Sequence, residues 1–301
     1  MAADQTYEHY YVPHNGWFPV FASAGIWLIL FGLADILRDM VQGVGHPVGL
    51  YFMFAGGLLM AFTLFHWFSK VIEENHQKLY SHQMNRSYVW AMSWFIFSEV
   101  MFFGAFFGAL FYVRLFVVDW LGGVGDRGPA NILWPNYHPA WPMLHTPDPK
   151  LFPGASEAIF PWGLPLMNTI LLVSSSFWVT FAHHGIKEGN RKKLIFWLSL
   201  TILFGLSFLF VQGYEYHHAY TELGLTLHAG IFGTTFFMLT GFHGAHVTLG
   251  TFMLIIMLFR AFKGHFEPDD CFGFEAASWY WHFVDVVWLG LFIFVYILGV
   301  Y

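Results

Sequence analysis

Long apolar runs separated by short polar stretches dominate this sequence. An α-helix rises about 1.5 Å per residue, so about 20 apolar residues cross the hydrocarbon core of a bilayer. Seven runs reach this length, and we expect a spanning helix in each. They lie at about 18–37, 48–68, 88–113, 161–184, 194–213, 229–259 and 276–300. The pattern predicts an all-α integral membrane protein with seven transmembrane helices, forming a single transmembrane domain over residues 1–301.

The longest polar connection, about 116–160, follows the third predicted helix. It contains seven of the thirteen prolines of the chain, together with Trp120, Trp134 and Trp141. Proline at this density argues against a regular helix. The aromatic side chains favour a loop that lies against the membrane or a partner over a disordered tail.

The basic residues predict the orientation of the helices. With the N-terminus inside, nine Lys and Arg residues fall on the inner side and four on the outer side, as the positive-inside rule expects. The inner set is Lys70, Lys78, Arg86, Lys187, Arg191, Lys192, Lys193, Arg260 and Lys263. The outer set is Arg38, Arg114, Arg127 and Lys150. We therefore expect the N-terminus inside, and the C-terminus and the long loop outside.

The composition agrees with a membrane protein. Hydrophobic residues make up 57% of the chain and charged residues 11%, and the mean hydropathy is +0.53. The single cysteine, Cys271, excludes an internal disulfide and argues against a cysteine-based zinc or iron–sulfur site. No motif indicates nucleic-acid binding. The first 17 residues contain no Lys or Arg, which argues against a secretory signal or a transit peptide.

One carboxyl lies alone inside an apolar run. Glu99 is the only Asp, Glu, Lys or Arg among the 27 residues between Arg86 and Arg114. A charge at this depth costs about 2.5–3.5 kcal/mol on insertion scales, so ionisable residues in such helices usually face the protein interior. Two interpretations of Glu99 stay open: a structural hydrogen bond to a neighbouring helix, or a role in proton or water access.

Polar residues also recur at helical spacing in the last two predicted helices. His243 and His246 share one face of the sixth helix, and His282 and Asp285 share one face of the seventh. We favour interhelical hydrogen bonds that join these two helices. Imidazole and carboxylate groups also suit zinc, copper or iron. However, the HExxH zinc spacing and any haem or di-iron pattern are absent, so we expect no metal site.

Glycines recur in the third and sixth predicted helices. Gly104 and Gly108 are four residues apart, and Gly241, Gly244 and Gly250 follow one another on the sixth helix. Small residues let helix backbones approach closely in lipid, so we expect these glycines at helix contacts.

Two strings of residues resemble a known family. Thr240–Val247 reads TGFHGAHV and Phe274–Leu289 reads FEAASWYWHFVDVVWL, as in subunit III of the haem–copper cytochrome c oxidases. Shorter matches lie at residues 17–19, 98–99, 165–169, 182–184 and 234–237. The resemblance covers nearly the whole chain.

The resemblance implies an accessory subunit, without catalytic residues or redox centres, in a proton-pumping aa3-type oxidase fed by cytochrome c. Haem a, haem a3, CuA and CuB would lie in partner subunits, of which subunit I is the main contact and subunit II another. The acid that matches Glu99 is the carbodiimide-reactive carboxyl of the family. The subunit would support proton uptake and the stability of the catalytic subunit. It would also bind phospholipid in a cleft between helices 1–2 and helices 3–7.

Five residues near the inner ends of the helices are candidates for lipid contact. They are Trp67, Glu74, Arg260, Lys263 and His265. A cation at this depth can pair with a lipid phosphate, although Trp and Arg also serve as ordinary interfacial anchors. Phe68 and Glu73 depart from the family pattern, which has Trp and Arg at these positions.

Three alternatives stay open at this point. A quinol-oxidising relative also fits, although its subunit III usually has five spans. A stand-alone proton-coupled transporter using Glu99 would need inverted repeats or broken helices, and the sequence has neither. A membrane metalloenzyme would use His243, His246 and His282. We favour the bacterial plasma membrane over the mitochondrial inner membrane as the location.

Overall fold

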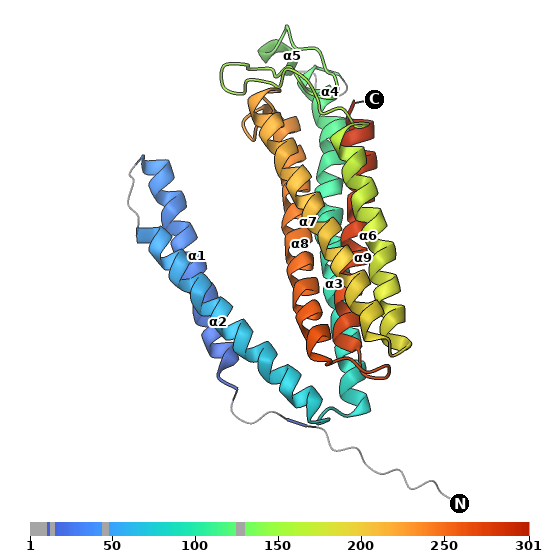
Figure 1. The fold of residues 1–301 in the computed structure, drawn as a ribbon. Coiled ribbons are helices and arrows are strands. Elements are labelled where there is room, and N and C mark those ends of the chain that lie inside the picture. The colour runs from blue at the N-terminus through green and yellow to red at the C-terminus, as the bar shows by residue number, and fades with distance from the viewer. Residues whose placement is uncertain (1–10, 13–15, 44–47, 125–129, 301) are drawn as a thin grey trace, which may run out of the picture. The chain divides into compact units, whose positions relative to one another are not determined.

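The computed structural model describes residues 11–12, 16–43, 48–124 and 130–300. These residues form helices joined by turns and loops, with no strand among them. Seven of the helices are long and apolar enough to cross a membrane (Figure 1). Their bounds are α1 Phe18–Gln42, α2 Val48–His76, α3 His82–Tyr112, α6 Leu164–Lys187, α7 Arg191–Thr221, α8 Gly230–Lys263 and α9 Phe272–Leu291. The prediction of an all-α protein with seven spanning helices is confirmed, whereas the side on which each terminus lies stays a prediction.

Most helices extend beyond the apolar runs that predicted them. α2 continues to His76 instead of ending near 68, and α7 continues to Thr221 instead of ending near 213. Hydropathy marks the part of a helix that lies in lipid, whereas backbone hydrogen bonds continue through the polar residues that follow. At its other end α7 has a cap, because the side chain of Asn190 accepts a hydrogen bond from the backbone N–H of Lys193 at 3.1 Å.

The long loop begins later than the sequence predicted. α3 continues through a wider π-type turn at Val113–Val117 into α4 (Val118–Leu121), so the predicted start of the loop is helical. One further short helix, α5 (Ala130–Leu133), is described before α6. Residues 125–129, which include Arg127 of the charge count, lie outside the described residues.

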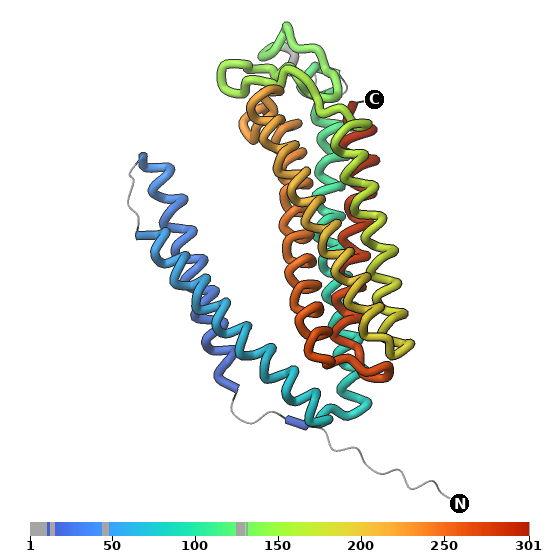
Figure 2. The backbone as a smooth tube through the Cα atoms, in the orientation of Figure 1, coloured from blue at the N-terminus to red at the C-terminus, as the bar shows by residue number. Residues whose placement is uncertain are grey.

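The chain forms two compact units, residues 1–90 and 91–301, which divide within α3. In the first unit α1 and α2 pack as an antiparallel pair (Figure 2). Two glycines seven residues apart on each helix, Gly25 and Gly32 on α1 and Gly49 and Gly56 on α2, form a glycine seam. A Cβ on Gly32 would lie 2.5 Å from the carbonyl oxygen of Gly49, and a Cβ on Gly56 would lie 2.8 Å from that of Gly25. Only glycine permits backbones this close.

The second unit is a bundle of α6, α7, α8 and α9 with the remainder of α3. Its most buried helix is α9, which places two tryptophans in the core. Trp281 Nε1 donates to Ser175 Oγ and Trp288 Nε1 donates to Thr169 Oγ1, both on α6 and both at 2.9 Å. Gly250 of α8 leaves room for Trp281, since a Cβ there would lie 3.0 Å from the indole. The two indole N–H groups are therefore satisfied within the protein, as an environment without water requires.

The glycines that the sequence predicted at helix contacts divide into two groups. Gly250 packs closely, and a Cβ on Gly241 would have one contact at 3.8 Å. Apart from the chain neighbours and the local helix backbone, no atom of the described residues of the second unit lies within 4 Å of the position that a Cβ on Gly104, Gly108 or Gly244 would take. Within this unit the prediction is wrong for these three glycines. The faces of α3 and α8 that meet carry large aromatic side chains, which keep the two backbones apart.

Candidate functional site

The carboxyl of Glu99 lies midway along α3 and has a partner on α8. Its Oε2 lies 3.0 Å from Nε2 of His246. The Glu99 side chain is 21% exposed and the His246 side chain 15% exposed. The isolated acid of the third span thus forms an interhelical hydrogen bond, and the bond remains reachable from the surface of the unit.

The second ring nitrogen of His246 determines the tautomer of its imidazole. Its Nδ1 lies 2.7 Å from the carbonyl oxygen of Phe242, one helical turn earlier. A carbonyl only accepts, so Nδ1 carries a hydrogen and donates it. Nε2 and the Glu99 carboxyl then share one proton, which makes a neutral acid with a neutral imidazole or a carboxylate with an imidazolium. The pair has no net charge in either form, which lowers its cost in an apolar environment.

Aromatic rings surround this pair. The centroid of the His246 ring lies 5.0 Å from that of Phe103, 5.9 Å from that of Phe102 and 6.4 Å from that of Phe283. Tyr280 of α9 stacks on the same imidazole at 6.4 Å. The rings place the hydrogen bond in a setting of low polarity, where a shared proton interacts strongly with both partners.

The other polar residues predicted on the last two spans connect more helices than expected. His243 is buried, and its Nε2 lies 3.1 Å from the backbone oxygen of Val284, which links α8 to α9. His282 links α9 to α6 instead, because its Nδ1 lies 2.5 Å from Ser176 Oγ. Asp285 is also buried, and neither of its carboxylate oxygens has a hydrogen-bond partner among the described residues. The three histidines His243, His246 and His282 therefore join α8 and α9 to each other, to α3 and to α6.

Two of the predicted lipid residues belong to the first unit. The Trp67 ring stacks on that of Phe18 with centroids 5.8 Å apart and remains over one-third exposed. Glu74 is buried, and its carboxylate accepts hydrogen bonds from Tyr11 at 3.2 Å and Tyr80 at 2.9 Å. Burial, together with the neighbouring carboxylate, raises the pKa of Tyr80, so this hydroxyl stays a donor at physiological pH.

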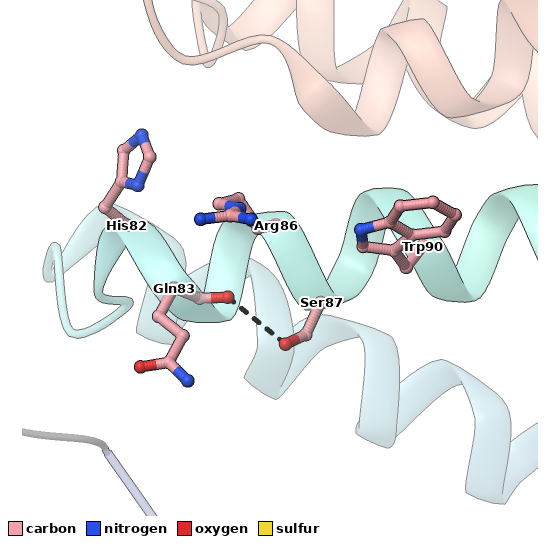
Figure 3. Close-up of a pocket in the computed structure, with 5 residues that line it drawn as sticks. All are labelled: His82, Gln83, Arg86, Ser87 and Trp90. Carbon is pink, nitrogen blue, oxygen red and sulfur yellow. Dashed lines mark hydrogen bonds between the residues drawn. The ribbon is translucent and has the colours of Figure 1, made fainter.

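Two hollows in the first unit contain cations that the sequence interpretation used only for orientation. One lies against α1 and α2 and is lined by Phe18, Phe21, Phe62, Thr63, His66, Ser69, Lys70 and Glu73. The other lies along the first turns of α3 and is lined by His82, Gln83, Arg86, Ser87 and Trp90. Figure 3 shows the side chains of His82, Arg86 and Trp90 on one side of α3, with Ser87 hydrogen-bonded to the backbone of Gln83. The first hollow therefore combines mainly apolar walls with Lys70, whereas the second is lined mostly by polar side chains beside Trp90 and contains Arg86.

The remaining predicted lipid residues belong to the second unit. The guanidinium of Arg260 lies 4.9 Å from the centroid of the Phe266 ring. It also packs against Gly273, where a Cβ would lie 2.8 Å from Nη1. Lys263 is exposed in the last turn of α8, and His265 is half-buried just beyond it. The three basic side chains therefore gather at one end of α8.

A buried acid in α7 was not among the candidate residues from the sequence. Glu215 lies near the end of a span, where a carboxylate can reach water, yet it is 1% exposed. Tyr296 donates to it at 2.6 Å and Gln212 at 3.5 Å, and Asn168 donates to Gln212 at 3.3 Å. The spacing of Gln212 and Glu215 on one helix face was the available signal.

These observations define a class of protein, a helical membrane protein with an acid–imidazole hydrogen bond between spanning helices. Residues 129–300 match the family model described as cytochrome c oxidase subunit III. The probable cytochrome c oxidase subunit 3 of Rickettsia conorii is 36% identical over 286 residues, which cover 93% of this chain and 90% of the relative. Cytochrome c oxidase subunit 3 of Oncorhynchus mykiss is 37% identical over 272 residues, which cover 90% of this chain and 93% of the relative. Cytochrome c oxidase subunit 3 of Gadus morhua is 39% identical over 245 residues, which cover 81% of this chain and 82% of the relative.

The chain belongs to the cytochrome c oxidase subunit III family. Its relatives are subunits of an enzyme complex, and its seven apolar helices fit an integral membrane protein.

Proposed function

We propose that this chain is the accessory subunit III of a proton-pumping aa3-type oxidase that takes electrons from cytochrome c. In this proposal it packs mainly against subunit I, also contacts subunit II, and contributes no catalytic residue. The haem a, haem a3, CuA and CuB groups belong to those partners. Membership of the family supports the proposal, and the bacterial relative is consistent with a bacterial plasma membrane.

The hydrogen bond between Glu99 and His246 carries the functional part of the proposal. A single proton in this bond can sit on an oxygen or a nitrogen 3.0 Å apart, without any change in net charge. A protonated carboxyl in apolar surroundings is the form that a hydrophobic carbodiimide attacks. We infer that the pair holds a proton within the membrane and thereby supports proton uptake by, and the stability of, the catalytic subunit.

The test compares the complete oxidase with an oxidase that lacks this chain. Loss of the chain is expected to leave the initial rate of electron transfer close to normal while turnover declines with continued cycling. An oxidase without the chain that cycled indefinitely at the normal rate would contradict the proposal. A reduced-minus-oxidised spectrum and a copper assay on the purified complex show whether haem a and copper accompany the chain.

A second experiment addresses Glu99 directly. Glu99→Gln is expected to abolish carbodiimide labelling of the chain while the complex still assembles. The matched control is Glu215→Gln, which removes a buried carboxyl of α7 that also accepts hydrogen bonds. Labelling that persisted in Glu99→Gln and disappeared in Glu215→Gln would assign the reactive carboxyl to α7 instead.

Phospholipid binding is the second part of the proposal. The hollows in the first unit support it, because Lys70, beside mainly apolar walls, and Arg86, beside the ring of Trp90, can each pair with a phosphate. Lipid extracted from purified complexes and quantified per haem tests this point. Lys70→Gln and Arg86→Gln are expected to lower the amount of retained phospholipid, whereas Lys78→Gln, an exposed cation outside both hollows, is not. Equal retention in all three variants would refute this assignment.

A further inference from the structure

Four side chains that the proposed function does not use converge where the end of α6 meets the start of α9. His183 and Lys187 lie one turn apart on α6, and Cys271 and Glu275 lie one turn apart at the start of α9. His183 Nε2 is 3.1 Å from Glu275 Oε1, and Cys271 Sγ is 3.3 Å from the same oxygen. The imidazole nitrogen, the sulfur and the carboxylate oxygen all lie within 4.8 Å of one another.

These separations are close to those that a tetrahedral metal ion requires. Zinc binds nitrogen at about 2.0–2.1 Å, oxygen at about 2.0–2.2 Å and sulfur at about 2.3 Å, which places neighbouring ligand atoms roughly 3.3–3.8 Å apart. Small rotations of the three side chains therefore suffice to surround one ion. Imidazole, thiolate and carboxylate together suit zinc, whereas calcium and magnesium prefer oxygen ligands alone.

A cation of the protein already occupies this position. Lys187 Nζ lies 3.1 Å from Glu275 Oε1 and 3.3 Å from Cys271 Sγ. The Lys187 side chain is 45% exposed, so its ammonium can leave into solvent without unfolding the helix. The side chains of His183 and Glu275 are also about one-third and one-quarter exposed, which leaves the site open to ions. Cys271 is buried behind them.

We propose that His183, Cys271 and Glu275 bind one Zn²⁺ ion in place of the Lys187 ammonium, with a water molecule as the fourth ligand. On binding, the sulfur–hydrogen bond of Cys271 breaks, its proton passes to solvent and the sulfur binds as a thiolate. No electron is transferred. This site is independent of the Glu99 pair, and it departs from the expectation that a chain with one cysteine has no zinc site.

Zinc affinity of the full-length chain in detergent, measured by competition with a chromophoric chelator, tests the proposal. His183→Gln and Cys271→Ser are each expected to weaken binding by about tenfold or more. His184→Gln is the matched control, because this neighbouring histidine is exposed and takes no part in the cluster, and its affinity should equal that of the wild type. Lys187→Met should bind zinc more tightly than the wild type, because the competing cation is gone.

The absorption spectrum of bound cobalt distinguishes a metal ligand from a residue with only a structural role. Co²⁺ bound by the wild-type chain should give the charge-transfer band of a cobalt–thiolate bond, and Cys271→Ser should lack it. Circular dichroism and size-exclusion profiles confirm that each variant is folded. Equal zinc affinities in the His183, Cys271 and His184 variants, or cobalt binding without the thiolate band, would overturn the site. An unchanged zinc affinity in Lys187→Met would overturn the proposal that zinc replaces the Lys187 ammonium.

Discussion

The glycine seam between α1 and α2 allows a matched pair of substitutions. Gly56 and Gly57 are neighbours in the middle of α2, but only Gly56 faces α1. A Cβ on Gly56 would lie 2.8 Å from the carbonyl oxygen of Gly25 and 2.8 Å from the backbone nitrogen of Ile29, whereas a Cβ on Gly57 would meet nothing within 4 Å. Alanine improves helix propensity at both positions by a similar amount, so the difference between the two variants isolates the contact.

The magnitude follows from the distance that the helices must move. Ordinary contact begins at 3.4 Å, so the helices must separate by roughly 0.6 Å, the difference between 3.4 Å and 2.8 Å. The obstructing atoms belong to backbone and cannot rotate away. A gap of about this size forfeits roughly a quarter of the dispersion energy along the seam, and overpacking of this kind typically costs about 1–3 kcal/mol. Gly56→Ala should therefore be about 1–3 kcal/mol less stable than Gly57→Ala.

Energy transfer between labels on the two helices measures this difference. In a Cys271→Ser background, cysteines at the exposed positions Val20 of α1 and Phe68 of α2 carry a donor and an acceptor, and the helices are separated by titration with a denaturing detergent. Gly56→Ala should separate at a lower detergent concentration than Gly57→Ala. Coincident transitions for the two alanine variants would refute the assignment of the seam.

Three further predictions concern the second unit. Trp281→Phe removes the hydrogen bond to Ser175 at 2.9 Å and should cost about 0.5–1.5 kcal/mol in detergent-induced unfolding, and an unchanged unfolding curve would contradict it. Burial raises the pKa of Cys271 to about 11, so alkylation of this sole cysteine should accelerate about tenfold per pH unit from pH 8 to 10, and a plateau below pH 9 would disagree. Arg114→Ala removes the 2.6 Å hydrogen bond to the backbone oxygen of Leu298 and should speed amide exchange in the last turn of the chain, unlike Arg38→Ala in the first unit.

The sequence predicted the spanning helices because the bilayer imposes the same length and apolarity on each of them. It also singled out Glu99, since a charge is rare in such a run. The partner of Glu99 was not predictable, because His246 lies 147 residues away and its spacing on α8 equally suited a contact with α9. Pair geometry of this kind depends on the rotation of each helix about its own axis, which hydrophobic periodicity determines poorly when a helix is apolar on all sides.

The glycines show how one rule can succeed and fail within the same chain. Small residues permit close approach, but they do not require it. Gly104 and Gly108 have the expected spacing, yet a Cβ on either would have no contact within 4 Å among the described residues of the second unit, because α3 meets α8 through ring contacts such as that of Phe102 with Phe242 at 5.1 Å. The glycines of α1 and α2 were overlooked, although their spacing of seven residues on two consecutive helices was visible in the sequence.

The glycine seam also bears on the order in which the protein is made. Its contacts lie entirely within the first 76 residues, so the two helices can associate as soon as α2 has left the ribosome. At about 5–20 residues per second, the 225 residues from 77 to 301 need roughly 10–45 s for synthesis. During that interval the hairpin of α1 and α2 can exist in the bilayer as an already folded unit. A fault in a later helix would then leave an intact hairpin in the membrane, available to quality-control proteases as a recognisable remnant.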